Sequence, residues 1–332
     1  MKSMNVLLAQ GIGDAIWGLF KAQSVAEKYN IKEICVRIAC SNPDNDTENR
    51  AISFIKRFSF VSECKMYPMP YHPEKCGSVL RRGPATHEDG SYRYIDSGFN
   101  RRLPDIDFVL IANGHLEKGI PLDDWLPEYK ANWNMVKHHY MLTLAESEYA
   151  NKFKKEVGDY AIFYTGPLSG NTTNGANKGG LWSPDDWIAL GESIYKNLGI
   201  KIVLVGAEYD YSYYEECLKK HTKDKSYWIN KIGKFKINKT FAVCRNSNFI
   251  ISYPSGIGIV SHYLGVPCCF FTRPYGNSLN DSKFVSFSDE MSHAWAYPNS
   301  KKSGKFLAAL YSKQTPNMVY DYIVQNNWHN GK

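Results

Sequence analysis

Apolar and polar residues follow two different patterns in the first half of the chain. Residues 4–10 form an almost continuous apolar run, typical of a strand buried in a parallel sheet, and the runs at 33–40 and 105–114 have the same character. Residues 14–29 and 51–58 instead carry apolar side chains at helical spacing. Strands that alternate with helices in this way predict a doubly wound α/β domain.

The same alternation begins again in the second half, after a polar, helix-like stretch. Four further strands are predicted, at 159–166, 200–208, 248–256 and 266–272. The helix between the first two of them has Ser183 as its N-cap, Pro184 in its first turn and Gly199 as its stop signal. Residues 303–328 also have a helical pattern, which Pro316 breaks in two.

These patterns divide the chain into domains. We expect residues 1–150 to form one Rossmann-like domain, residues 151–315 a second, and residues 316–332 a terminal helix that packs back on the first domain. Residues 65–104 fit neither series, because they contain five prolines and five arginines. A long irregular segment in a compact domain is typical either of a binding loop or of a disordered segment.

Composition narrows the function classes. The formal net charge of +7 is a mild basic excess, which suits an anionic substrate and is small for a protein that coats nucleic acid. The eight cysteines contain no CxxC pair, so we expect no zinc or iron–sulfur site and no metal ligands. No secretory signal and no apolar run of transmembrane length is visible. We expect a cytoplasmic protein without stable membrane insertion; the oligomeric state stays open.

Two turns that contain glycine carry candidate chemistry. In the second half, Ser255, Gly256 and Ile257 open a helix after a strand, and no acid lies in its first turn. The free N–H groups and the positive end of such a helix attract anions, and this site suits a diphosphate. In the first half, Gly13 is followed by Asp14, whose carboxylate would repel a phosphate. The two turns therefore call for different ligands.

Four motifs of the chain, in this order, resemble those of the ADP-heptose heptosyltransferases, glycosyltransferase family nine. The turn at 11–14 resembles the family's glycine–aspartate turn, and residues 181–194 resemble its tryptophan–proline–acid–tryptophan helix. The strand at 200–208 resembles the next strand of the family, which ends in a glycine and an acid. Residues 250–271 resemble its strand–turn–helix signature, and the matching residues are Ser255, Gly256, Gly265, Val266 and Pro267.

The resemblance implies a GT-B fold, in which two doubly wound Rossmann-like domains face a cleft. It also implies an inverting glycosyltransferase without a cofactor or metal, which moves a sugar from a nucleotide-sugar co-substrate to an acceptor hydroxyl. Asp14 would then be the general base, a role that suits a carboxylate kept ionised by a helix N-terminus; the alternative is that Asp14 is only an N-cap. Pro254 and Ile259 stand where the family has the aspartate and histidine that help hold the donor, so the donor sugar stays open.

Candidate donor-binding residues lie in the second half. The resemblance places the diphosphate at the helix that Ser255 opens, with Lys178 neutralising the departing group. Thr165 and Gly166 follow a strand at the edge of the sheet where ligands usually bind. Glu208 or Asp210, after the next strand, would accept hydrogen bonds from ribose hydroxyls. A solvated surface position is the alternative for the lysine and for both acids.

Candidate acceptor-binding residues lie in the first half, and they are Gly13, Arg101, Arg102, Asn113 and His115. The glycine adjoins the base, the arginines suit an anionic acceptor, and the last two residues follow a predicted strand end. The resemblance favours a surface glycan as the acceptor. The alternative acceptor is a hydroxymethylated base in DNA, because the arginines would bind phosphates while Tyr92 and Tyr94 stack on bases.

Two interpretations from other classes stay open. Residues 11–16 begin like the fingerprint of an NAD(P)-linked oxidoreductase, but Ile16 replaces its third glycine and Asp14 lies at the phosphate position. A non-catalytic sugar-binding protein would account for Pro254 and Ile259 as traces of a lost donor site. Turnover of a nucleotide sugar distinguishes a transferase from both.

Overall fold

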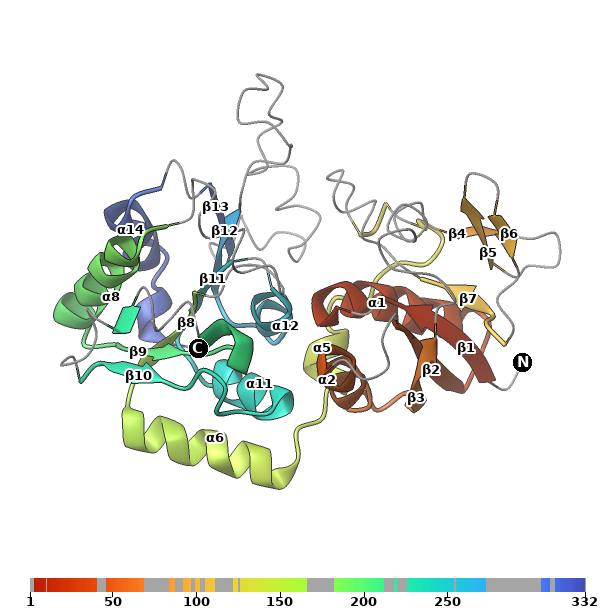
Figure 1. Ribbon diagram of the computed structural model, residues 1–332, viewed down its shortest axis with the longest axis horizontal. Coiled ribbons are helices and arrows are strands. Elements are labelled where there is room, and N and C mark those ends of the chain that lie inside the picture. The colour runs from red at the N-terminus through yellow and green to blue at the C-terminus, as the bar shows by residue number, and fades with distance from the viewer. Residues whose placement is uncertain are drawn as a thin grey trace, which may run out of the picture. The chain divides into compact units, whose positions relative to one another are not determined.

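The computed structural model describes residues 3–9, 11–40, 46–68, 84–86, 92–96, 99–101, 105–110, 122–124, 126–165, 182–211, 218–219, 226–253, 255–272, 306–310 and 314–331. These residues form two compact units that divide between Met141 and Leu142. Each unit is built around its own parallel sheet (Figure 1).

The first unit has a four-stranded parallel sheet in the order β3-β2-β1-β7. Its strands are β1 (Ser3–Leu8), β2 (Glu33–Cys40), β3 (Val61–Pro68) and β7 (Phe108–Val109). Helices α1 and α2 connect the first three strands, and their bounds are Ile12–Lys28 and Asp46–Ile55. The sequence predicted both helices and each of these strands except β3. Between residues 61 and 67 this strand buries only Cys64, so it has no apolar run by which to recognise it.

Helix α1 lies close against the sheet. Every residue from Ala15 to Ala26 is buried. Gly18 makes the approach possible, because a Cβ atom at this position would lie 2.1 Å from the backbone oxygen of Leu110, just after β7. A larger residue would push the helix away from the sheet. The position of the N-terminus of α1, where Asp14 lies, therefore depends on this contact.

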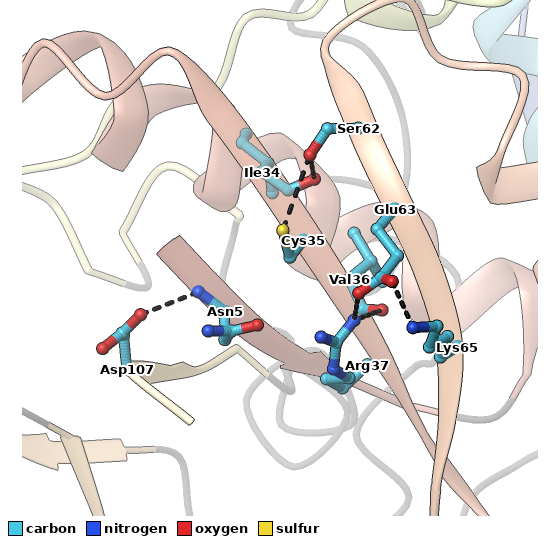
Figure 2. Close-up of polar contacts among 9 residues, drawn as sticks. All are labelled: Asn5, Ile34, Cys35, Val36, Arg37, Ser62, Glu63, Lys65 and Asp107. Atoms are coloured by element: carbon cyan, nitrogen blue, oxygen red, sulfur yellow. Dashed lines mark hydrogen bonds and ion pairs between the residues drawn. The ribbon is translucent and has the colours of Figure 1, made fainter. Parts of the chain in front are cut away.

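Side chains along β2 and β3 alternate between the two faces of the sheet. Val36 and Cys64 are buried on one face, and polar side chains occupy the other (Figure 2). Arg37 of β2 forms an ion pair with Glu63 of β3, with 2.6 Å between Nη1 and Oε2, and Lys65 pairs with the same carboxylate. These side chains remain partly exposed, so the ion pairs add little to stability. Their presence shows that this edge of the sheet is not buried on both faces.

A three-stranded antiparallel sheet lies within residues 65–104, and its strands are β4 (Pro84–Thr86), β5 (Tyr92–Asp96) and β6 (Phe99–Arg101). The expectation of an irregular segment is wrong for these strands and for the second half of β3. Tyr94 pairs with Pro84 on one side and with Arg101 on the other, so β5 is the central strand. Pro84 is tolerated because it lies at the start of an edge strand, where its missing N–H removes no hydrogen bond from the centre of the sheet.

The junction between the units is short. The first unit ends after α5 (Met135–His139), where the Met141 N–H donates to the Arg57 oxygen at 2.9 Å. The second unit begins with α6 (Leu144–Val157), whose N-cap Thr143 forms a capping box with Glu146. Both ends of the junction are therefore fixed by hydrogen bonds within their own unit.

The second unit has a six-stranded parallel sheet in the order β10-β9-β8-β11-β12-β13. Its strands are β8 (Tyr160–Tyr164), β9 (Lys201–Leu204), β10 (Trp228–Asn230), β11 (Ile250–Ser252), β12 (Cys268–Thr272) and β13 (Phe306–Leu310). The helices described in this unit beside α6 are α8 (Pro184–Leu198), α11 (Ile237–Arg245), α12 (Gly256–Tyr263) and α14 (Pro316–Gln325). The caps predicted for α8 are confirmed, because Ser183 Oγ accepts from the Asp186 N–H and Gly199 is left-handed with φ of 70°.

Strand β13 corrects the helical pattern predicted for residues 303–328. Residues 306–310 pair in parallel with β12 along their whole length. A short apolar run fits a helix and a buried strand equally well, and here the open edge of β12 decides. Pro316 lies in the first turn of α14 and starts that helix instead of breaking one.

Helix α14 packs on α8, within the second unit. Val319, Ile323 and Trp328 are buried in the same core as Trp187 of α8. The apolar face of the helix is therefore used inside the second unit, and the packing of residues 316–332 on the first domain stays a prediction. No helix in the described part of the chain is long and apolar enough to cross a bilayer.

Candidate functional site

The carboxyl ends of the parallel strands bring the predicted donor residues of the second unit to one edge of its sheet. Strand β8 leads into Thr165, β9 into the loop with Glu208, and β11 into Ser255. Strand β8 lies between the other two in the sheet. The crevice beside such strand ends is where ligands bind in doubly wound sheets. This edge is therefore the candidate donor site.

Helix α12 presents an acid-free N-terminus at this edge. Its N-cap is Ser255, whose Oγ accepts from the Gly258 N–H at 3.2 Å, and its first turn contains no acidic residue. The first turn of a helix has N–H groups without intrahelical partners, and here they include those of Gly256 and Ile257, both half-buried. The predicted anion site therefore has the required local structure: a capped, positively polarised helix end that solvent can reach.

Gly258 lets α12 approach the strands closely. A Cβ atom at this position would lie 2.3 Å from a ring carbon of Phe270 and 2.5 Å from Ser252 Oγ. Both neighbours are buried in the sheet, so neither can move aside at low cost. Any larger residue would lift the first turn of the helix off β11 and β12. The absence of a side chain at Gly258 thus holds the anion-binding turn at the edge of the sheet.

The two acids after β9 have different surroundings, which decides between them. Asp210 is buried, and its Oδ2 accepts from the Ala207 N–H at 2.7 Å while its Oδ1 accepts from the Tyr164 hydroxyl at 3.3 Å. Glu208 is exposed. The carboxylate available for a ligand is therefore that of Glu208, whereas Asp210 is committed to the protein. The sequence contains a signal for this difference, because Asp210 follows Ala207 by three residues, which is the spacing of a capping box.

Asp14 is the third residue of α1 and not its N-cap. The N-cap is Gly11, which has no side chain to make a capping bond. The Asp14 carboxylate lies over this glycine, because a Cβ atom on Gly11 would be only 2.6 Å from Asp14 Oδ2. The alternative that Asp14 is the N-cap is therefore wrong. Asp14 is half-buried and Gly13 is buried, so the acid is held at the helix start and partly open to solvent.

Several predicted site residues fall outside the described part of the chain: Gly166, Lys178, Arg102, Asn113 and His115. Arg101 is the last residue of β6. The second unit alone thus brings together Thr165, Glu208 and the Ser255 turn, and the roles of the other candidates remain predictions.

Buried cysteines do not supply the chemistry of either site. Burial raises the pKa of the Cys64 thiol and of the Cys244 thiol to about 12, and it raises the pKa values of Cys268 and Cys269 as well. A thiol in such surroundings stays protonated and inert. Among the described residues, no group of three or more histidine, cysteine or acidic side chains comes together in the manner of a metal site.

Two parallel-sheet units with helices between their strands define an α/β protein of the doubly wound class. Its fold is similar to that of the E. coli ADP-heptose LPS heptosyltransferase II, with a TM-score of 0.60 and 13% identity over 99% of both chains. A glycosyl transferase of family 9 from Veillonella parvula also has a TM-score of 0.60, with 14% identity over 98% of this chain and 97% of that chain. The predicted GT-B fold is confirmed.

The same fold carries other reactions. A putative UDP-N-acetylglucosamine 2-epimerase from Listeria monocytogenes has a TM-score of 0.51, with 10% identity over 99% of this chain and 89% of that chain. No protein-family model and no curated protein sequence matches the chain. The fold is therefore established by these comparisons, and the reaction has to be argued from the residues.

Proposed function

We propose that the chain is an inverting glycosyltransferase that moves a sugar from a nucleotide-sugar donor to an acceptor hydroxyl without a metal ion. The observation that carries this proposal is the distribution of acids between the two helix starts. Helix α12 has no acid in its first turn, whereas α1 has Asp14 there. A helix N-terminus without an acid suits the binding of a diphosphate, and the carboxylate at the N-terminus of α1 suits the role of a general base.

The donor half of the reaction belongs to the second unit. The diphosphate accepts hydrogen bonds from the first turn of α12, where Ser255, Gly256 and Ile257 lie, and the helix dipole favours its charge. Glu208 accepts hydrogen bonds from the ribose hydroxyls. Thr165 borders the same edge, and Gly166 and Lys178 complete the donor site in this proposal. As the glycosidic bond breaks, the helix end and the lysine stabilise the leaving nucleoside diphosphate.

The acceptor half belongs to Asp14. Its carboxylate removes the proton of the acceptor hydroxyl while the oxygen attacks the anomeric carbon from the side opposite the diphosphate. A single displacement of this kind inverts the anomeric centre. A carboxylate is a weak base, so it acts late, when the attacking oxygen has begun to bond to a sugar with oxocarbenium character and its proton has become more acidic. In this proposal the N-terminus of α12 binds the charged donor, and Asp14 at the N-terminus of α1 accepts the proton of the acceptor.

The acceptor itself is proposed to be an anionic surface glycan, bound with the help of Arg101, Arg102, Asn113 and His115 beside Gly13. Hydroxymethylated DNA is the second candidate acceptor. The small antiparallel sheet supports this second candidate, because Tyr94 of β5 pairs directly with Arg101 of β6 in its backbone register. Aromatic residues and arginines are the residue types that most often contact bases and phosphates.

The experiment that tests the reaction is donor turnover by the whole chain. The protein is incubated with ADP- and UDP-sugars, with and without a bacterial glycan extract, and the release of nucleoside diphosphate is measured. The proposal expects release that the extract accelerates and that Asp14→Asn lowers by at least ~100-fold, the scale of a general base. Conversion of the nucleotide sugar into an isomer without release would assign the chain to epimerases. Binding without turnover would leave a sugar-binding protein.

A further inference from the structure

The loop after β9 is tied to the neighbouring strand by one buried carboxylate. Asp210, the last residue of the 3-10 turn Glu208–Asp210, is 2% exposed. Its Oδ2 accepts from the Ala207 N–H at 2.7 Å, which closes the turn on itself. Its Oδ1 accepts from the hydroxyl of Tyr164, the last residue of β8, at 3.3 Å. The turn is therefore anchored to the carboxyl end of the adjacent strand.

Two glycines allow this anchoring, one on each side of the turn. A Cβ atom on Gly206 would lie 2.8 Å from Asp210 Oδ2, so only glycine leaves room for the carboxylate. Gly233, in the loop after β10, has φ of 68° and donates its N–H to the Gly206 oxygen at 3.0 Å. A Cβ atom on Gly233 would lie 3.3 Å from the Glu208 Cα. The Glu208 backbone thus lies close to Gly233, within the turn that Asp210 closes.

The Glu208 side chain is exposed although its backbone is held in this way. A glutamate in a loose loop would lose much conformational freedom on binding a ligand, whereas one on a fixed backbone loses only that of its own side chain. The anchoring therefore matters for whatever Glu208 binds. It also fixes the place of Glu208 relative to β8, which leads into Thr165.

We propose that Asp210 is a positioning residue of the donor site: with Tyr164 and Ala207 it fixes the turn so that the Glu208 carboxylate meets the ribose hydroxyls of the nucleotide. This inference rests on the proposed function, because it takes the ligand of Glu208 from there. Asp210 itself touches no ligand in this account. Its effect on binding passes through Glu208 and through the ribose hydroxyls alone.

The test compares ADP with 2′,3′-dideoxy-ADP, which lacks both ribose hydroxyls, by calorimetric titration of the whole chain. Wild type should bind ADP more tightly, on the order of 10-fold or more, the value of hydrogen bonds to a charged group. Glu208→Gln and Asp210→Ala should each remove most of this preference, and the double variant should lose no more than Glu208→Gln does. Both variants should bind the dideoxy nucleotide as wild type does.

Two further variants keep the result interpretable. Tyr164→Phe removes one anchoring bond and leaves the buried carboxylate in place, so it should reduce the preference partly and only while Glu208 is present. Glu146→Ala removes a capping carboxylate from α6 of the same unit, whose Oε2 accepts from the Thr143 N–H at 2.8 Å, and should leave the preference unchanged.

Four outcomes would overturn the proposal. If Asp210→Ala weakened both nucleotides by the same factor, or if its effect added to that of Glu208→Gln, Asp210 would be a purely structural residue, and the donor site itself would stand. If wild type bound both nucleotides equally, Glu208 would not contact the ribose, and the positioning role would fall with it. If wild type bound neither nucleotide and no other nucleoside diphosphate, the proposed function would fail as well.

Discussion

Replacing Lys21 by methionine should remove a pH dependence from the stability of the first unit. Lys21 lies on α1 and is fully buried. Its Nζ donates to the backbone oxygen of Tyr129 at 2.7 Å. Burial lowers the pKa of Lys21 to about 8, although the carboxylate of Asp123 acts in the opposite direction. Asp123 in turn accepts from the Trp133 indole N–H at 3.0 Å. Tyr129, whose backbone oxygen accepts from the lysine, lies between these two residues in the sequence.

The size and sign of the effect follow from the two pKa values. In the unfolded chain Lys21 has its ordinary pKa of 10.5, and in the folded chain the pKa is about 8. Below pH 8 both states are protonated, and the cost of the buried charge is constant. Between pH 8 and 10.5 the unfolded state binds more protons, so the free energy of unfolding rises with pH. The full rise corresponds to about 3 kcal/mol, of which about 2 kcal/mol is reached by pH 9.5.

Urea unfolding of wild type and Lys21→Met at pH 7, 8.5 and 9.5 measures this effect. At pH 7 the variant loses a buried charge but also leaves the Tyr129 oxygen without its donor, and these two changes oppose each other. The informative quantity is therefore the difference between the two proteins as a function of pH. It should grow in favour of wild type above pH 8, by about 2 kcal/mol at pH 9.5.

Lys32→Met is the matched control, because Lys32 is exposed and its replacement should leave the pH dependence as in wild type. All other titrating groups are common to the three proteins and cancel in the comparison. Parallel stability curves for wild type and Lys21→Met across this range would refute the reasoning. They would mean that Lys21 is solvated, with an ordinary pKa, in the folded protein.

Two predictions concern the proposed reaction. Donor turnover should persist in excess EDTA, because the α12 N-terminus and Lys178 supply the positive charge; loss of turnover that Mg²⁺ or Mn²⁺ restores would contradict the metal-free mechanism. If DNA is the acceptor, duplex affinity should fall with salt at a log–log slope of roughly −0.9 per phosphate contacted, and replacing Arg101 and Arg102 by alanine should flatten that slope by about two units. Undetectable duplex binding at low salt would exclude DNA and leave a glycan.

Sequence patterns were sufficient for the elements whose signals are local. The helix from Pro184 could be delimited because its N-cap, first-turn proline and stopping glycine are all specified by neighbouring residues. The buried strands β1, β8, β9, β11 and β12 could be found because strands covered on both faces are apolar throughout most of their length. Strand β2 could be found because Arg37 alone interrupts its apolar run from Ile34 to Cys40. For the same reason β3 was missed, since its ion-paired face breaks the apolar run.

Elements that depend on distant partners could not be predicted. The strand at 306–310 exists because β12 offers an edge, and the packing of α14 depends on an apolar face that α8 presents. The small antiparallel sheet depends on cross-strand partners that no single segment reveals. At the site, sequence identified both acids after β9, but only their burial separates Glu208, which solvent reaches, from Asp210, which the protein uses.

The central claim, that the α12 N-terminus holds the diphosphate of a nucleotide donor, is tested most directly by thermal unfolding with nucleotides. One nucleoside diphosphate at about 100 times its Kd should stabilise the second unit by about 2.7 kcal/mol and raise the Tm of that unit by on the order of 5–10 °C. The corresponding monophosphate should do much less. Gly256→Asp, which places an acid in the first turn of α12, should abolish the shift. Equal shifts with mono- and diphosphate, an undiminished shift in Gly256→Asp, or no shift with any nucleoside diphosphate would contradict the claim.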